Sequence, residues 1–125
     1  MFQIDLKSRK ALYEQVADNF KRLITTGVLK ENEKAPSIRE LAGMLDVNPN
    51  TVQKAYRELE SQGYFYTVLG QGNFIAPPPA DSDGAVVKQW LAVLLEAARE
   101  LLYRGVTVPE MVGFIEKEAV IGDKA

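Results

Sequence analysis

The side chains best suited to recognition lie between residues 37 and 57, and they are hydrogen-bonding groups more than catalytic ones. The stretch holds Arg39, Asn48, Asn50, Thr51, Gln53 and Lys54. Guanidinium and amide groups can make paired hydrogen bonds to the edges of bases, and a threonine methyl can contact the methyl group of thymine. The chain contains no histidine and no cysteine, so the commonest general base and the thiolate nucleophile are missing. We therefore expect a binding protein that uses neither catalysis nor a cofactor nor a metal.

Two short helices must position these side chains. Ser37 and Glu40 have the Ser-x-x-Glu spacing of a capping box, which predicts that a helix begins at Ile38. A few residues further on, Asn48 can cap a second helix, with Pro49 at its first position. A helix, a tight turn and a second helix form the helix-turn-helix motif, whose second helix enters the major groove of DNA.

An earlier amphipathic helix is predicted from apolar residues at helical spacing between Leu12 and Ile24, and Gly27 is placed to end it. The helix that follows Asn48 has its own apolar stripe. Its members are Val52, Ala55, Tyr56 and Leu59. These two stripes predict that the first and third helices pack on a common core.

The periodicity of the sequence changes after Gly63. Residues 64–68 and 73–76 are rich in strand-forming side chains, and residues 69–72 have the composition of a turn. This pattern predicts a β-hairpin. The order helix, helix, tight turn, helix, hairpin is that of a winged helix-turn-helix, which we place at residues 1–76.

The remainder of the chain predicts a linker and a helical hairpin. Three prolines at residues 77–79 cannot continue a helix, so we expect a linker over residues 77–84. Residues 85–125 predict two helices, the second capped by Thr107 and Glu110. Two helices cannot bury so many apolar side chains alone, so we expect a homodimer. The residues expected at its interface are Trp90, Leu91, Leu94, Leu101, Met111, Phe114 and Ile115. The predicted fold class is thus mainly α with a small β-hairpin (α+β).

Charge and hydropathy are compatible with this prediction. The net charge is −2, but residues 1–76 carry a net +1 and residues 77–125 a net −3 when Lys, Arg, Asp and Glu are counted. A modest positive balance in the first part is compatible with DNA binding, because the placement of charge matters more than its total. The first residues lack the apolar stretch of a secretory signal, and no apolar run has the length of a membrane span. We expect a cytoplasmic protein without membrane contact.

Residues 3–76 resemble the DNA-binding domain of the GntR family of bacterial regulators. The matching pieces are Leu12-Tyr13-Glu14-Gln15, Pro36-Ser37, Arg39-Glu40-Leu41-Ala42, Val47-Asn48, Asn50-Thr51-Val52, Ala55-Tyr56, Leu59-Glu60, Gly63-Tyr64 and Gly70-Gln71-Gly72-Asn73-Phe74. The short helical remainder is similar to the YtrA subfamily, in which such a tail is expected to dimerise. The resemblance implies a transcription repressor that binds a pseudo-palindromic operator as a homodimer.

The resemblance also implies which residues contact DNA. Arg39 matches the family arginine that reaches the bases from the second helix, and it is our candidate for the main specific contact. The full set of expected DNA-binding residues is Ser37, Arg39, Asn48, Pro49, Asn50, Thr51, Gln53, Lys54, Arg57, Gly70, Gln71 and Gly72. The chain departs from the family at Pro49, where many relatives carry an arginine. It departs again at Asn32 and Glu33, which replace a Pro-Gly pair and predict a less rigid loop.

Two other functions stay open on the sequence. A winged helix can also serve as a protein-interaction module that does not bind DNA, and the overall acidity of the chain suits such a role. Trp90, Tyr103 and Phe114 could line a ligand pocket, although dimer packing explains them better because few polar groups accompany them. The sequence leaves open whether a small-molecule effector exists, which operator is bound and whether the protein represses or activates.

Overall fold

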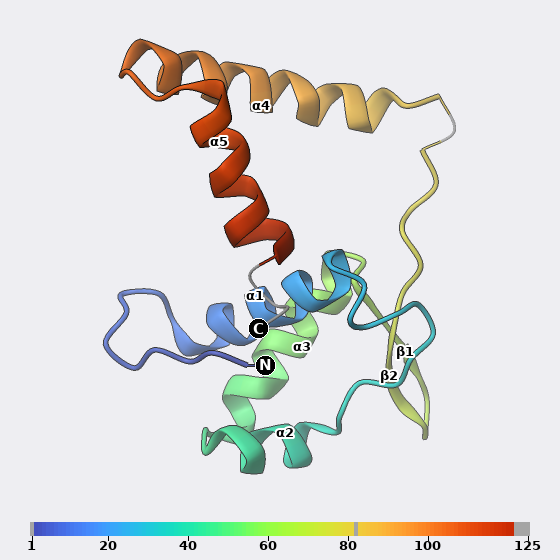
Figure 1. Cartoon of the computed structure of the whole chain (residues 1–125). Helices are drawn as coiled ribbons and strands as arrows, with labels where there is room; N and C mark the ends of the chain where they lie inside the picture. Colours follow the sequence, from blue (N-terminus) through green and yellow to red (C-terminus); the bar gives the residue numbers. More distant parts are fainter. Residues whose placement is uncertain (1, 82, 122–125) are drawn as a thin grey trace. The chain divides into compact units, whose positions relative to one another are not determined.

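The computed structural model describes residues 2–81 and 83–121, and Figure 1 shows the course of the chain. The chain divides into two compact units, residues 1–78 and residues 79–125. We call the first unit the head and the second unit the tail, and describe each by itself. The division falls inside the predicted linker of residues 77–84.

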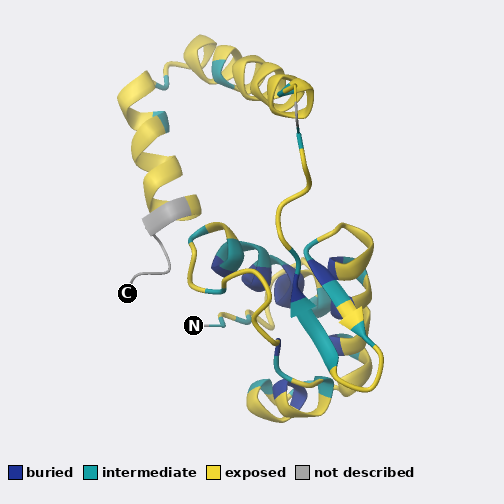
Figure 2. Cartoon of the chain, turned by 90° about the vertical axis from the view of Figure 1, so that its right-hand side faces the viewer, coloured by how far each residue is buried: buried dark blue, intermediate teal, exposed yellow. Residues whose placement is uncertain are grey.

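The head contains three helices followed by a β-hairpin. In chain order they are α1 (Leu12–Thr25), α2 (Ile38–Leu45), α3 (Pro49–Ser61), β1 (Phe65–Val68) and β2 (Gly72–Ile75). This order confirms the predicted winged helix-turn-helix. Helix α3 packs against α1, α2 and β1, and the buried residues drawn in dark blue in Figure 2 gather along these contacts.

The core of the head is apolar and closely packed around aromatic rings. The ring of Phe20 lies edge-on to those of Tyr56 and Phe65, with centroids 5.5 and 5.1 Å apart, and Tyr56 and Phe65 pack on each other in the same way at 5.1 Å. Edge-to-face pairs of this kind add to the free energy of apolar burial. All four residues of the predicted α3 stripe are buried, at 0–3% exposure.

The helix boundaries in the helix-turn-helix follow the local sequence signals. Ser37 Oγ accepts a hydrogen bond from the Glu40 amide, and a Glu40 carboxylate oxygen accepts one from the Ser37 amide, both at 3.1 Å. Helix α2 ends at Asp46, which adopts the left-handed conformation with φ +56°. Asn48 then caps α3, with Pro49 as its first residue. The capping box and the Asn48 cap are confirmed.

The β-hairpin carries a third backbone segment that the sequence analysis did not assign to the sheet. Phe65 pairs with Ile75 in the antiparallel register, and Lys34 forms a bridge with Phe74 on the other side of β2. The Asn32 amide donates to the Ile75 carbonyl at 2.7 Å, and the Ile75 amide donates to the Glu33 carbonyl at 2.9 Å. Strand-like hydrogen bonds therefore hold the backbone of residues 32–33 to β2, and lower rigidity than that of a Pro-Gly loop stays a prediction.

The tail consists of α4 (Ala85–Tyr103), α5 (Val108–Ile115) and the π-helix η1 (Glu116–Ile121). Asp81 accepts hydrogen bonds from the amides of Val86 and Val87, at 3.1 and 3.0 Å, so the acidic end of the linker caps α4. Thr107 and Glu110 form the predicted capping box of α5. Neither α4 nor α5 contains a buried residue. Among the described residues, no helix is long and apolar enough to cross a membrane.

Candidate nucleic-acid interface

Helix α3 presents one polar face to solvent and one apolar face to the core. Asn50, Gln53, Lys54 and Arg57 are spaced i, i+3, i+4 and i+7, and all four are exposed. The opposite stripe is buried. The fold therefore brings four of the predicted DNA-binding residues onto a single face of one helix, which we call the recognition face. Thr51, on the flank of this face, is half-buried.

The start of α2 adds Ser37 and Arg39, both exposed. Ser37 Oγ accepts the Glu40 amide in the capping box, and the Ser37 side chain also hydrogen-bonds the Glu40 carboxylate. Arg39 makes no ion pair with any residue that the structure describes. Hydrogen bonds from the backbone amide and the side chain of Ser37 hold the pKa of the Glu40 carboxyl below its ordinary value, so Glu40 is ionised at neutral pH. Its negative charge lies in the first turn of α2, where the helix dipole favours it.

Tyr56 joins the two helices of the motif. Its hydroxyl donates to the Pro36 carbonyl at 2.7 Å, and its ring lies in the core at 3% exposure. Burial, and secondarily the negative charge of Glu40, raises the pKa of the Tyr56 hydroxyl, so this group stays a donor at every physiological pH. The bond fixes the start of α2, where Arg39 lies, relative to α3 and its recognition face.

Two of the predicted contacts have structural partners that restrict them. Asn48 Oδ1 accepts from the Asn50 amide at 2.8 Å, so the cap occupies one lone pair of this oxygen and leaves the side-chain NH₂ donors for a base or a phosphate. The ammonium group of Lys54 lies 4.1 Å from the ring centroid of Tyr13 on α1. This cation–π contact orients the Lys54 side chain at the edge of the recognition face.

The tip of the hairpin, residues 69–71, carries the wing residues. The Gln71 amide donates to the Val68 carbonyl at 2.9 Å, which closes the turn. Gly70 has φ +78°, a conformation that favours glycine. A Cβ atom at Gly72 would lie 3.3 Å from the Lys34 side chain. Gln71 is exposed beside these two glycines, so the backbone at the tip can approach another surface closely.

A hydrogen-bonded group of side chains connects the hairpin to the end of α3. Thr67 on β1 contacts the Glu60 carboxylate of α3 and lies 2.9 Å from Asn73 Oδ1 on β2. These bonds hold the wing against α3. The Glu60 contact could not be assigned from the sequence, because residues 60 and 67 belong to different predicted elements.

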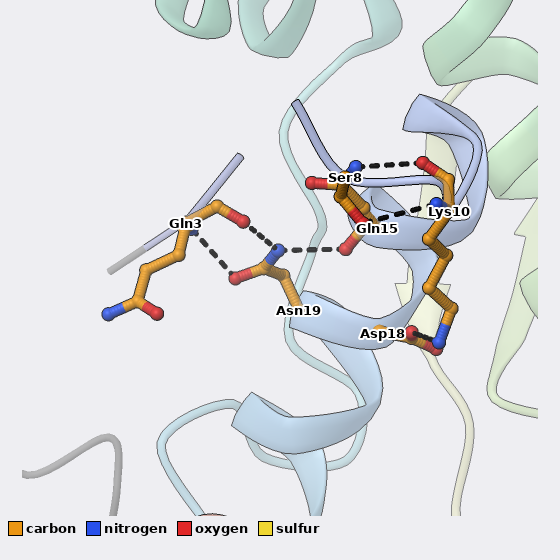
Figure 3. A network of polar contacts seen from close by, with 6 residues as sticks. All are labelled: Gln3, Ser8, Lys10, Gln15, Asp18 and Asn19. Carbon is orange, nitrogen blue, oxygen red and sulfur yellow. Dashed lines mark hydrogen bonds and ion pairs between the residues drawn. The ribbon is translucent and has the colours of Figure 1, made fainter. Parts of the chain in front are cut away.

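Two buried amides on α1, which the sequence pattern did not single out, fix the N-terminal arm, residues 2–10 (Figure 3). Asn19 exchanges two hydrogen bonds with the backbone of Gln3, at 2.9 and 3.1 Å. Gln15 bonds the backbone of Asp5 and Lys10 at 2.7–3.0 Å. Their position beside the buried stripe of α1 was the available signal, since buried polar side chains are hydrogen-bonded, most often to the backbone or water.

The predicted dimer residues lie on the surface of the tail. Trp90, Leu91, Leu94, Leu101, Phe114 and Ile115 are 40–67% exposed, and Met111 is half-buried. The structure thus leaves them available to a partner. Within the described part of the chain, no group of acidic side chains is arranged to hold a metal ion.

The fold and the recognition face define a regulatory protein of the winged helix-turn-helix class. The model of the family described as "Bacterial regulatory proteins, gntR family" matches residues 12–75. The chain belongs to this GntR family. The resemblance found in the sequence motifs is confirmed.

Similar proteins agree with this assignment. The transcriptional repressor YtrA of Bacillus subtilis is 35% identical over 121 residues, covering 94% of this chain and 91% of YtrA. A solved transcriptional antiterminator from Listeria monocytogenes is 41% identical with a TM-score of 0.73, covering 94% and 88%. The DNA-binding domain of AraR, solved with its operator ORX1, is 29% identical with a TM-score of 0.53, covering 60% and 96%. The predicted likeness to the YtrA subfamily is thereby confirmed.

Proposed function

We propose that this chain, a DNA-binding transcription regulator by its family, is a repressor that binds a pseudo-palindromic operator as a homodimer in the cytoplasm. The observation that carries the proposal is the recognition face, an exposed polar stripe on a helix whose other side is fixed in the core. The likeness to the repressor YtrA supports the direction of regulation. The AraR domain, a structural neighbour, was solved on operator DNA.

The recognition face would enter the major groove, as the second helix of such motifs does. Asn50 and Gln53 offer amides for adenine, and Arg39 offers its guanidinium for guanine. Lys54 and Arg57 would contact phosphates and contribute affinity more than specificity. At the wing, Gly70, Gln71 and Gly72 would approach the minor groove.

Pro49 is expected to alter the operator preference. It begins α3, is exposed and stands where many relatives carry an arginine. A proline has no polar group that could read a base edge, so it can offer only apolar contact. We propose that the base facing Pro49 is read less strictly, or differently, than in relatives with arginine there.

The test measures binding of the full chain to the promoter of its own gene and to a scrambled duplex of equal length, by fluorescence anisotropy. We expect a tighter complex with the promoter than with the scrambled duplex. We also expect the logarithm of the binding constant to fall linearly with the logarithm of the salt concentration. Arg39→Ala should lower the discrimination between the two duplexes by about 1–3 kcal/mol, or roughly 5–150-fold.

Arg99→Ala is the matched control, since it removes the same charge from an exposed position of the tail. Discrimination that is unchanged by Arg39→Ala would refute the role of that residue. Affinity for both duplexes that is absent at every salt concentration would favour the protein-interaction module instead. A footprint covering one half-site would contradict the homodimer.

A further inference from the structure

An apolar groove of about 490 Å³ lies in the tail between α4 and α5. Helix α4 contributes Leu94, Ala97, Ala98 and Leu101, and α5 contributes Phe114 and Ile115 among others. The four α4 residues have the spacing i, i+3, i+4 and i+7. Four residues at this spacing form the hole that receives one side chain of a facing helix in knobs-into-holes packing.

The α4 wall of the groove has small side chains at its middle. Ala97 and Ala98 lie next to each other in its lining, between Leu94 and Leu101. A hole lined by two alanines fits a large side chain better than a leucine, because interiors pack without voids. The lining therefore favours an aromatic occupant.

Helix α4 carries such a side chain on the same face, outside its own groove. Trp90 lies one turn before Leu94 and is 66% exposed, and it does not line the groove. Val86, Val87 and Leu91 beside it are 52–56% exposed. The first half of α4 thus carries exposed apolar side chains that no described residue covers. Side chains of its second half line the groove.

We infer that the groove is filled by Trp90 of a second copy, in an antiparallel α4 pair centred on Leu94. This inference rests on the proposed homodimer and specifies its register. In that register Trp90 faces Ala98 of the second copy, Leu91 faces Ala97, and Val87 faces Leu101. Each large side chain then meets a smaller one or a leucine, and two-fold symmetry fills both grooves.

A parallel pair does not achieve this packing. It would place Trp90 against Trp90 and the alanines against each other, which leaves the groove empty. The antiparallel arrangement also sets opposite ends of the two helix dipoles side by side. The structure therefore favours one direction of pairing.

A small ligand suits the groove less well. Among the described residues of the lining, Glu110 alone is charged, and one of its oxygens accepts the hydrogen bonds of Thr107 in the capping box. Binding pockets for small molecules carry a few convergent polar groups. A ligand in the groove would also leave the apolar half of α4 uncovered, whereas a second copy covers both regions together.

Trp90 is the only tryptophan of the chain, so intrinsic fluorescence reports on it directly. The experiment dilutes the full chain across its dissociation range, measured in parallel by sedimentation. We expect blue-shifted emission and weak quenching by acrylamide in the dimer, and a red shift that follows dissociation. A dimer whose emission is that of exposed tryptophan would overturn the register while leaving the homodimer intact. A monomer at all concentrations would overturn both.

A size swap tests the pairing of residues 90 and 98. Trp90→Ala and Ala98→Trp should each weaken the dimer by about 30-fold or more, as loss of an interface hot spot does. The double variant should recover most of that loss, because the large and small residues exchange places. Glu96→Ala, on the opposite side of α4, should leave dimerisation unchanged. A double variant no stronger than either single variant would refute the pairing.

Discussion

The head and the tail are both mainly helical, and each begins one helix with a capping box, yet only the head closes a core. Thirteen of the described hydrophobic residues of the head are buried, whereas α4 and α5 contain no buried residue. Local signals are therefore sufficient to start a helix but not to give it a partner. The head buries its apolar surface within itself, whereas the apolar surface of α4 and α5 stays exposed.

Removal of residues 80–125 should give the largest effect on DNA binding. The head has its own core and should stay folded, but it should become monomeric. Linkage of two heads raises the effective concentration of the second, so its loss should weaken operator binding by about 10²–10⁴-fold. Anisotropy on the full operator measures the loss, and sedimentation measures the oligomeric state. A truncated chain with full affinity would refute the role proposed for the tail.

Truncation of one apolar side chain in the head and one in the tail should have different effects on the free energy of unfolding of the head. Leu59→Ala, at a position with 0% exposure, should lower the free energy of unfolding by about 2–5 kcal/mol. Leu91→Ala, at 54% exposure, should leave the unfolding of the head unchanged and weaken only dimerisation. Urea titration followed by circular dichroism at low protein concentration separates the two. Equal losses in both variants would mean that the tail is part of the head's core.

The N-terminal arm allows a similar comparison within the head. Asn19→Leu removes the side-chain partners of Gln3 and should cost about 1 kcal/mol or somewhat more, since partly buried backbone groups lose their bonds. Hydrogen exchange at the Gln3 amide should accelerate. Lys10→Ala, which breaks an exposed ion pair with Asp18, is the control and should cost less than about 1 kcal/mol. An unchanged exchange rate of the Gln3 amide in Asn19→Leu would show that contacts other than the Asn19 hydrogen bonds hold the arm.

The two capping boxes should give the smallest and most local effects. The pKa of Glu40 is lowered by its bonds to Ser37, and that of Glu110 by its bonds to Thr107. A lowered pKa means that each carboxylate stabilises the folded state above its ordinary value of 4.5, and that this contribution is lost as the pH falls through the lowered pKa.

Glu40→Gln should therefore reduce the dependence of head stability on pH between about 5 and 3, the region around and below the ordinary carboxyl pKa. Ser37→Ala should lower head stability by about 1 kcal/mol near neutral pH. Glu110→Gln should leave both properties of the head unchanged. Urea titrations at several pH values measure these differences, and a head that responds to Glu110→Gln would contradict the independence of the two units.

Much of this molecule followed from short stretches of sequence. The Ser37 cap, the left-handed Asp46, the Asn48-Pro49 start and the β-hairpin depend on residues within a few positions of each other. The family motifs also lie within single elements, so the class of protein was predictable. For the same reason the recognition face could be predicted from helical spacing.

Only the tertiary structure decided which distant residues meet. It placed Asn19 beside Gln3, joined Lys34 to the hairpin and brought Glu60 to Thr67. It also left the face of α4 around Trp90 uncovered. Periodicity indicates that a helix face is apolar, but it cannot show what covers that face, because the partner is fixed by packing between segments far apart in the chain or in another copy of it.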